Sequence, residues 1–373
     1  MAGFATLDLW GGAAKVDASA KPKLRVALIG CGGISGAHIE GWRKLNPTAQ
    51  IVACADPIEE RRHQRGDELG LPKEARFPYL KDLLKSGIEV DAIDICANNA
   101  AHCPVTVEAL NAGLHVMCEK PLATTPADVK KMIAARDKNK NKKLILMCAQ
   151  STRFMNSALH LHDYLKGGVL GEVYYCRAQF LRRRYLPTRI GFIDKRISGG
   201  GPCIDVGVHM LDLALHLMNH PEPVTVTAIA PQKLAKRTDI RGWWGEWDRK
   251  AITVEDFAAG FIRFKNGAAL TLECSWLANM KEPELQKITL MGTEAGAEWP
   301  ELTIHGEKAG STTDVQLKYP DDGVGGHQRE IEVYADAILT GKSSPVPPEQ
   351  SLNVIRILDG LYRSHKAGRE VKV

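Results

Sequence analysis

The chain has 373 residues, more than the roughly 250–300 at which a single hydrophobic core stops growing, so two domains are expected. Its residues are 44% hydrophobic and 25% charged, and 49 basic against 44 acidic side chains leave a net charge of +5. This composition is that of an ordinary globular protein and, without a long basic run, argues against a nucleic-acid partner.

The N-terminal segment and the cysteines indicate where the protein resides. Residues 1–21 lack a basic segment followed by a long apolar core, and no later segment reaches the ~18 apolar residues of a membrane span. The nine cysteines are scattered through apolar stretches without the spacing of a zinc site or a disulfide framework. We therefore expect reduced thiols, no membrane partner, a cytoplasmic location and a loose N-terminal extension over residues 1–21.

The first structural signal is the stretch Leu24–Gly36, LRVALIGCGGISG, in which an apolar run ends in glycines. It predicts the first strand and turn of a dinucleotide-binding βαβ unit, in which backbone N–H groups at a helix start face a pyrophosphate. Gly30 would make the turn and Gly32 would let the diphosphate approach, while the small Ser35 replaces the third glycine of the motif.

An acidic residue follows at the expected offset. The second predicted strand, Gln50–Ala55, ends at Asp56, about 20 residues beyond the glycine motif, where a carboxylate accepts hydrogen bonds from the adenosine ribose. This spacing favours NAD over NADP. Two alternatives stay open: Asp56 could be an ordinary turn residue before Pro57, and Arg61 or Arg62 could hold a 2′-phosphate.

Strands and helices continue to alternate up to residue 150, which predicts an α/β domain with a doubly wound parallel sheet over residues 22–150. Residues at the carboxyl ends of such strands face the ligand crevice. Lys120 is one of them, and a lysine there can donate to a substrate oxygen and stabilise a developing alkoxide. Considered alone, a strand-end lysine before proline is more often a solvated surface residue. The predicted strands are Arg25–Ile29, Gln50–Ala55, Val90–Cys96, His115–Cys118 and Lys143–Ala149.

Beyond residue 151 the pattern changes to alternating strands without crossover helices, joined in one place by the hairpin turn Asn266-Gly267. It predicts an α+β domain over residues 151–373 with an antiparallel sheet and helices near 156–166, 204–218, 327–340 and 350–366. The expected strands are Glu172–Leu181, Pro223–Ala230, Val254–Phe264 and Ala268–Trp276.

A second candidate for chemistry follows a glycine run at residues 199–201. Asp205, His209 and Asp212 would share one face of the predicted helix. A histidine on an apolar helix is usually a core residue. Here an aspartate one turn earlier could orient the imidazole or raise its basicity, as suits a general base near neutral pH.

Together, GCGGIS, the strand ending in CAD, the EKP at residues 119–121, QSTRF and GGGPCIDVGVHMLD resemble the Gfo/Idh/MocA oxidoreductase family, over nearly the whole chain from about residue 22. The resemblance implies a Rossmann domain that binds NAD(P) and a second domain with an open-faced, mainly antiparallel sheet that forms homodimers or homotetramers. It also implies that Lys120 contacts the reacting hydroxyl, that His209 takes its proton, and that Asp205 positions the substrate or the imidazole.

The resemblance extends to the cofactor site. The family's usual Thr-Pro-Asn appears here as residues 97–99, Ala-Asn-Asn, and a proline common after the Arg-Phe pair is Asn156, which affects contacts near the ribose and the substrate. The positions implied for binding NAD are Gly30, Gly32, Ile34, Asp56, Asn99, His102, Glu119 and Gln150.

Four side chains are candidates for binding the substrate. Arg153 could reach cofactor or substrate, or form an interdomain ion pair. Tyr185 follows three arginines at a strand end, and Trp243 and Trp244 lie in a long connection, where aromatic faces could stack on a pyranose ring or seal a subunit interface.

No group of residues in the sequence suggests a required metal. His160 and His162 lie two apart on a predicted helix, so they face different directions and make a poor metal site.

Members of the family act mostly on sugars, sugar nucleotides and cyclitols. We therefore predict an NAD-dependent dehydrogenase acting on CH–OH groups, which transfers a hydride between nicotinamide and a secondary hydroxyl or ketone of a sugar, glycoside or cyclitol. An alternative is an NAD-dependent glycosidase that oxidises a glycoside transiently, eliminates the aglycone and returns the hydride. A non-catalytic sensor is disfavoured because the EKP and DxxxH segments are intact.

Overall fold

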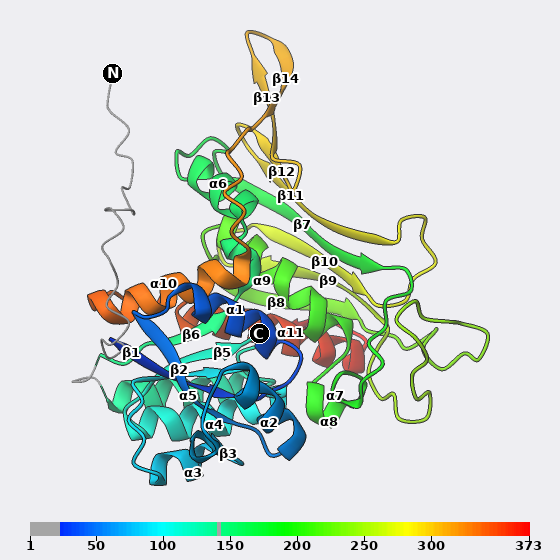
Figure 1. The fold of residues 1–373 in the computed structure, drawn as a ribbon. Helices are drawn as coiled ribbons and strands as arrows, with labels where there is room; N and C mark the ends of the chain where they lie inside the picture. The colour runs from blue at the N-terminus through cyan, green and yellow to red at the C-terminus, as the bar shows by residue number, and fades with distance from the viewer. Residues whose placement is uncertain (1–22, 140–142) are drawn as a thin grey trace, which may run out of the picture.

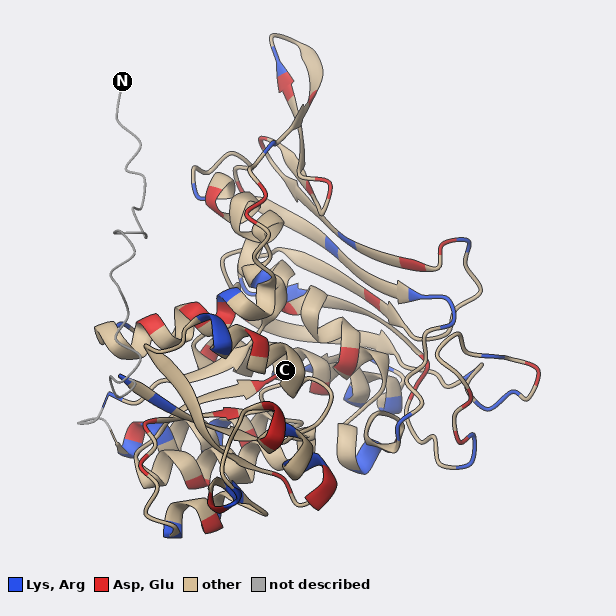
Figure 2. Ribbon diagram, in the orientation of Figure 1, with Lys and Arg blue, Asp and Glu red and all other residues tan. Residues whose placement is uncertain are grey.

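The computed structural model describes residues 23–139 and 143–373 as two sheets with helices packed around them (Figure 1). The N-terminal extension predicted for residues 1–21 lies outside the described residues. Basic and acidic side chains are interspersed over both parts of the molecule (Figure 2). Among the described helices, none combines the length and the apolar character that crossing a membrane requires. All nine cysteines are free thiols.

The first sheet is the predicted doubly wound one. Its six strands are parallel and follow the order β3-β2-β1-β4-β5-β6. The order reverses between β1 and β4, and ligands bind at the carboxyl ends of the strands at such a switch point. The strands are β1 (Leu24–Ile29), β2 (Ala49–Ala55), β3 (Arg76–Phe77), β4 (Ala92–Ile95), β5 (His115–Glu119) and β6 (Leu146–Ala149). The helices between them are α1 (Ser35–Lys44), α2 (Glu59–Glu68), α3 (Leu80–Lys85), α4 (Asn99–Ala112) and α5 (Pro126–Lys138).

The second sheet has nine strands in the order β14-β13-β12-β11-β7-β10-β9-β8-β15. It is mainly antiparallel, but β7 and β10 pair in parallel, so the sheet is mixed. The parallel pair is possible because a long connection, with its own helices and two strands, separates β7 from β10. The strands are β7 (Val173–Arg182), β8 (Pro223–Ile229), β9 (Phe257–Phe264), β10 (Ala269–Ser275), β11 (Glu284–Gly292), β12 (Gly296–Trp299), β13 (Thr303–Lys308), β14 (Ser311–Gln316) and β15 (Val371–Lys372).

The C-terminal helices return to the first sheet. α10 packs against α1, and α11 packs against both α5 and β8, so the last part of the chain joins the two sheets (Figure 1). The helices of this part are α6 (Asn156–Leu165), α7 (Ile190–Ile193), α8 (Lys195–Ser198), α9 (Val208–Leu217), α10 (Gly326–Thr340) and α11 (Pro348–Ala367).

Candidate active site

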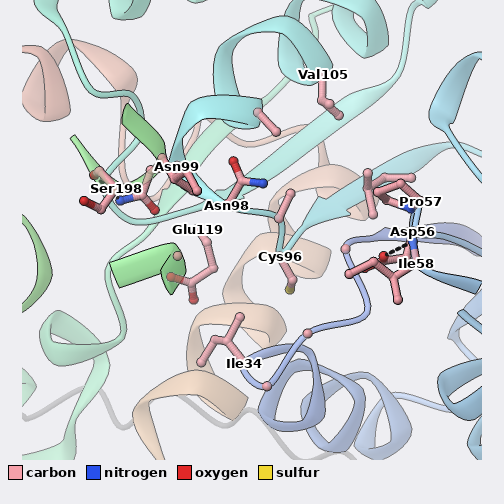
Figure 3. Close-up of a pocket in the computed structure, with 18 of the residues that line it drawn as sticks. Ile34, Asp56, Pro57, Ile58, Cys96, Asn98, Asn99, Val105, Glu119 and Ser198 are labelled. Carbon is pink, nitrogen blue, oxygen red and sulfur yellow. Dashed lines mark hydrogen bonds between the residues drawn. The ribbon is translucent and has the colours of Figure 1, made fainter. Parts of the chain in front are cut away.

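A cavity of about 1010 Å³ lies at the carboxyl ends of the parallel strands, with walls from both parts of the chain. Figure 3 shows Ile34, Asp56, Asn99 and Glu119 around it. The facing wall comes from residues 189–192 and 197–205. The cavity is therefore formed where the first sheet meets the segment that precedes α9.

The glycine loop has the geometry that a dinucleotide needs. Gly30 has a φ of +96°, and a Cβ there would lie 2.5 Å from the backbone nitrogen of Ala97, so no other residue fits. A Cβ on Gly32 would meet no atom within 4 Å, which leaves the loop open toward the cavity. Ser35 is fully buried and its hydroxyl donates to the Gly32 carbonyl at 2.6 Å. The loop and the start of α1 thus fit a pyrophosphate.

Asp56 is held at the edge of this loop. Its Oδ1 accepts the backbone N–H of Ile58 at 2.8 Å (Figure 3). Its Oδ2 accepts the backbone N–H of Cys31, also at 2.8 Å. Each carboxylate oxygen keeps acceptor capacity for a ribose hydroxyl. Arg62 donates to the Asp56 carbonyl at 2.7 Å, whereas Arg61 lines the cavity.

Lys120 follows β5 and crosses the cavity to the second part of the chain. Its Nζ donates to the backbone carbonyl of Asp205 at 2.8 Å and lies 3.3 Å from the Asp205 carboxylate. The other Asp205 oxygen accepts the indole N–H of Trp276 at 3.0 Å. Burial raises the pKa of Asp205, but the charges of Lys120 and Arg182 and the hydrogen bond from Trp276 act against it, so the net effect is a lowered pKa. Asp205 is thus an ionised partner for Lys120.

His209 is close enough to this pair for the charges of Lys120 and Asp205 to act on it, but it does not line the cavity and its hydrogen bond is made elsewhere. Its Nδ1 is 3.2 Å from the Thr152 hydroxyl, and the described residues show no hydrogen bond between His209 and Asp205. The two carboxylate oxygens of Asp205 instead accept from Lys120 and from the indole of Trp276, and Asp205 itself lies in a π-helical turn over residues 203–207 that precedes α9. Burial and then the charge of Lys120 lower the pKa of His209 to about 3. The imidazole is therefore neutral at pH 7 and can accept a proton.

A buried network supports the strand end before Lys120. His38 contacts Asp94 through Nδ1 at 2.8 Å and Glu119 through Nε2 at 2.9 Å, and Glu119 accepts the backbone N–H of Lys120 at 2.9 Å. Burial by itself raises the pKa of Glu119. The hydrogen bond and the charge of His38 act in the opposite direction and are stronger, so the net pKa is about 2. The Glu119 carboxylate, which lines the cavity, is thus fixed by protein contacts.

This network includes a grouping that sequence reasoning missed. His38, Glu119, His327 and Glu330 bring ligand atoms within 4.8 Å of one another. They come from α1, the end of β5 and α10, so no spacing in the sequence reveals them. His327 already contacts Glu330 at 2.9 Å and His38 contacts Glu119, and we assign no metal to these paired groups.

The remaining predicted cofactor residues divide into two groups. Ile34 and Asn99 line the cavity, although the Asn99 amide also donates to the Ser198 carbonyl at 2.7 Å. His102 and Gln150 are buried and do not line it. Both His102 nitrogens contact backbone carbonyls, and the Gln150 amide oxygen has no partner among the described residues.

Arg153 does not line the cavity. Its guanidinium pairs with Asp212 through two contacts of 2.5 and 2.6 Å and donates to Gln350 at 2.6 Å. All three residues follow residue 150, so this is a buried ion pair within the second part of the chain. The sequence left an interdomain ion pair as one interpretation of Arg153. The structure shows an ion pair, but both partners lie in the same part of the chain.

Tyr185, Trp243 and Trp244 come together outside the residues that line the cavity. The ring centroid of Tyr185 lies 5.0 Å from that of Trp243 and 5.2 Å from that of Trp244. His160 and His162 face different neighbours, since His160 stacks on Tyr319 and His162 on His216.

Arg189 is a cavity residue that sequence reasoning missed. Its Nη1 lies 3.1 Å from the position of a Cβ on Gly33, so a cation from the second part faces the glycine loop. Beside it, Ile190 and Phe192 are exposed and line the cavity, as Ile34 does on the opposite wall. The segment around Arg189 has no periodicity or motif that could have indicated this contact.

Comparison with known proteins identifies both parts of the chain. A model of an oxidoreductase family with an NAD-binding Rossmann fold matches residues 24–147, and a model of the GFO/IDH/MocA C-terminal domain matches residues 158–310. D-glucoside 3-dehydrogenase of Escherichia coli is 31% identical over 94% of this chain and 97% of its own length. D-xylose 1-dehydrogenase (NADP(+)) 2 of Haloferax volcanii is 28% identical over 91% of this chain and 99% of its own. The structure of levoglucosan dehydrogenase in complex with NADH superposes with a TM-score of 0.79 at 22% identity, covering 94% of this chain and 99% of that one.

Proposed function

The chain belongs to the Gfo/Idh/MocA oxidoreductase family, and we propose on that premise that it is an NAD-dependent dehydrogenase of a secondary hydroxyl in a sugar, glycoside or cyclitol. The observation that carries the proposal is the contact of Lys120 with ionised Asp205 in the wall of the dinucleotide cavity, close enough for both charges to act on neutral His209. The relative named D-glucoside 3-dehydrogenase supports the substrate class.

The described residues fit a dinucleotide. Gly30, Gly32 and the start of α1 would hold the pyrophosphate, Asp56 the adenosine ribose, and Asn99 and Glu119 the nicotinamide side of the cavity. When bound, the nicotinamide supplies the hydride acceptor. The choice of NAD over NADP rests on Asp56, while Arg61 in the cavity wall and the NADP(+)-dependent relative define the alternative.

The chemistry of the protein groups follows from their charges. Lys120 donates a hydrogen bond to the reacting hydroxyl oxygen and stabilises the alkoxide that develops there. His209 accepts the hydroxyl proton, which its neutral state at pH 7 permits. Asp205 fixes the Lys120 ammonium and offers an acceptor to a neighbouring hydroxyl of the substrate. Thr152 fixes the orientation of the imidazole through Nδ1, which leaves Nε2 for the substrate.

We also propose a cytoplasmic homodimer or homotetramer. The nine free thiols suit a reducing compartment. The face of the nine-stranded sheet that carries Arg177, Gln179 and Glu273 has no helix against it in the described residues and is the surface for subunit contacts.

The function is tested by mixing purified protein with NAD⁺ and a panel of free sugars, inositols and glycosides while recording reduced-nicotinamide absorbance. A rise with one substrate class is the expected result. Cleavage of a glycoside without net formation of NADH would instead support the NAD-dependent glycosidase. No turnover of any kind with either NAD⁺ or NADP⁺ would contradict the proposal.

A further inference from the structure

Tyr185, Trp243 and Trp244, called the aromatic platform below, form a cluster that the proposed chemistry at Lys120 does not use. Trp243 and Trp244 are each 51% exposed although they pack against the ring of Tyr185. Aromatic rings in this state present a broad apolar surface to solvent, and such surfaces commonly mark binding sites.

The loop that presents the two tryptophans is anchored by buried contacts. The carboxylate of Asp256 accepts three consecutive backbone N–H groups at the start of the loop, at 2.6–2.8 Å. The indole of Trp247 donates to the Ala235 carbonyl at 2.7 Å, and the backbone N–H of Trp243 donates to the Arg184 carbonyl at 2.9 Å. The exposed indoles are therefore held in position before any ligand arrives, which lowers the entropic cost of binding.

The platform lies on the same face of the nine-stranded sheet as α9. Along β7, Ala178 and Phe180 are buried on the face against which α9 packs, whereas Gln179 points to the other face. Arg182 is two residues beyond Phe180, so it shares the covered face. Its guanidinium carbon lies 4.8 Å from the Phe180 ring and 5.0 Å from the Trp244 ring. Trp244 is therefore on the side of the active site and not on the open side.

Two short connections join the platform to Asp205. The backbone N–H of Tyr185 donates to the carbonyl of Trp276 at 3.0 Å, and the indole of Trp276 donates to Asp205 at 3.0 Å. Arg182, which stacks on Trp244, also contributes to the charge field around Asp205. In the fold, the loop of the platform lies beyond the ends of β7 and β10 (Figure 1).

We propose that the aromatic platform is a second subsite that stacks on the apolar face of a ring joined through the glycosidic bond to the sugar held by Lys120 and Asp205. This inference rests on the proposed dehydrogenase function and narrows its substrates from sugars, glycosides and cyclitols to glycosides that carry a second ring. The chemistry that the platform recognises is a six-membered ring with an apolar face, which an aryl aglycone and a second pyranose both offer.

The experiment compares kcat/KM for glucose, methyl β-glucoside, phenyl β-glucoside and cellobiose in the wild type, Trp244→Ala and Trp243→Ala. We expect phenyl glucoside or cellobiose to exceed methyl glucoside by about tenfold in the wild type, as one stacked ring supplies. This ratio should fall toward one in both tryptophan variants. Tyr174→Ala, which removes a ring of equal exposure at the opposite end of β7, is the matched control and should keep the wild-type ratio. The higher kcat/KM of phenyl β-glucoside or of cellobiose shows whether the platform prefers an aryl ring or a second sugar ring.

The outcomes separate the two proposals. Oxidation of methyl glucoside with no preference for a second ring, or a preference that survives Trp244→Ala, overturns the subsite and leaves the dehydrogenase function standing.

If no substrate is oxidised, the proposed function fails. The subsite is then tested by tryptophan fluorescence during titration with phenyl glucoside and with methyl glucoside. A fluorescence change specific to phenyl glucoside and lost in Trp244→Ala supports it, and equal responses overturn it. A change of oligomeric state in Trp244→Ala shows that a second copy covers the platform, which also overturns the subsite.

Discussion

The ammonium of Lys120 lies 2.8 Å from the backbone carbonyl of Asp205 and 3.3 Å from its carboxylate, so one contact joins the end of β5 to the turn before α9. These residues are 85 positions apart in the sequence. The contact holds the ammonium group in the cavity between the two parts of the chain, where it could donate to a substrate oxygen. Lys120 is therefore the first residue to test.

We expect Lys120→Ala to lower kcat by about 10²–10⁴-fold, because it removes the donor that stabilises the developing alkoxide. Affinity for NADH should stay within about threefold, since the glycine loop and Asp56 carry the dinucleotide. Steady-state kinetics and a fluorescence titration with NADH measure the two quantities. Turnover close to that of the wild type would refute the assignment of Lys120.

The lowered pKa of His209 leads to a prediction about pH. Because burial and Lys120 hold its pKa near 3, His209 stays neutral well below the usual histidine range, and its protonation should not reduce kcat/KM until about pH 4. His209→Asn should lower kcat strongly at every pH between 6 and 9. In Lys120→Ala the pKa of His209 should rise, so the acidic limb of the profile should move to higher pH. An acidic limb that stays in place would show that the Lys120 charge does not act on His209.

The sequence predicted the parts of this site that depend on local order. Gly30, Asp56 and Lys120 each follow a buried parallel strand, and the topology of the sheet brings such positions to one edge. The doubly wound sheet was predicted for the same reason, apart from the two-residue strand β3. Strands β11–β14 were not predicted, and β14 shows why: it is exposed along almost its whole length and carries no alternation.

Contacts between distant segments could not be predicted. The π-helical turn over residues 203–207, which includes Asp205, has no marker in the residue pattern. The sequence left open whether Arg153 contacts a ligand or forms an ion pair, because its partners Asp212 and Gln350 are 59 and 197 positions away. Arg189 escaped notice for the same reason, since only the folded chain places it opposite Gly33.

We expect Arg189→Ala to raise the Kd for NADH about tenfold, because the guanidinium faces the loop that would hold the pyrophosphate. Arg189→Lys should fall between this variant and the wild type, since it keeps the charge but not the planar fork. The titration with NADH used for Lys120 measures the effect. Arg183→Ala, an exposed arginine that does not line the cavity, serves as control. Equal affinities in Arg189→Ala and the control would exclude a contact with the cofactor.

The cofactor choice is tested at Asp56. Asp56→Ser removes the carboxylate that would accept the ribose hydroxyls and repel a 2′-phosphate, while Arg61 remains in the cavity wall. We expect the ratio of kcat/KM for NAD⁺ to that for NADP⁺ to fall by at least about tenfold. An unchanged ratio, or a wild-type enzyme that prefers NADP⁺, would favour the reading in which an arginine holds a 2′-phosphate.

Acid sensitivity should come in part from the histidines on and after α9. Burial, with the charge of Arg153, lowers the pKa of His216 to about 2 and that of His220 to about 3. Below about pH 6.5 the unfolded chain binds protons at these positions while the folded chain does not, so the free energy of unfolding falls as the pH falls toward 3. His216→Gln should therefore lose less thermal stability than the wild type between pH 7 and 5. The exposed His365→Gln is the control, expected to follow the wild type in melting curves over the same range. A variant at His216 that loses as much stability as the wild type would show that protonation of the unfolded chain at this position contributes nothing.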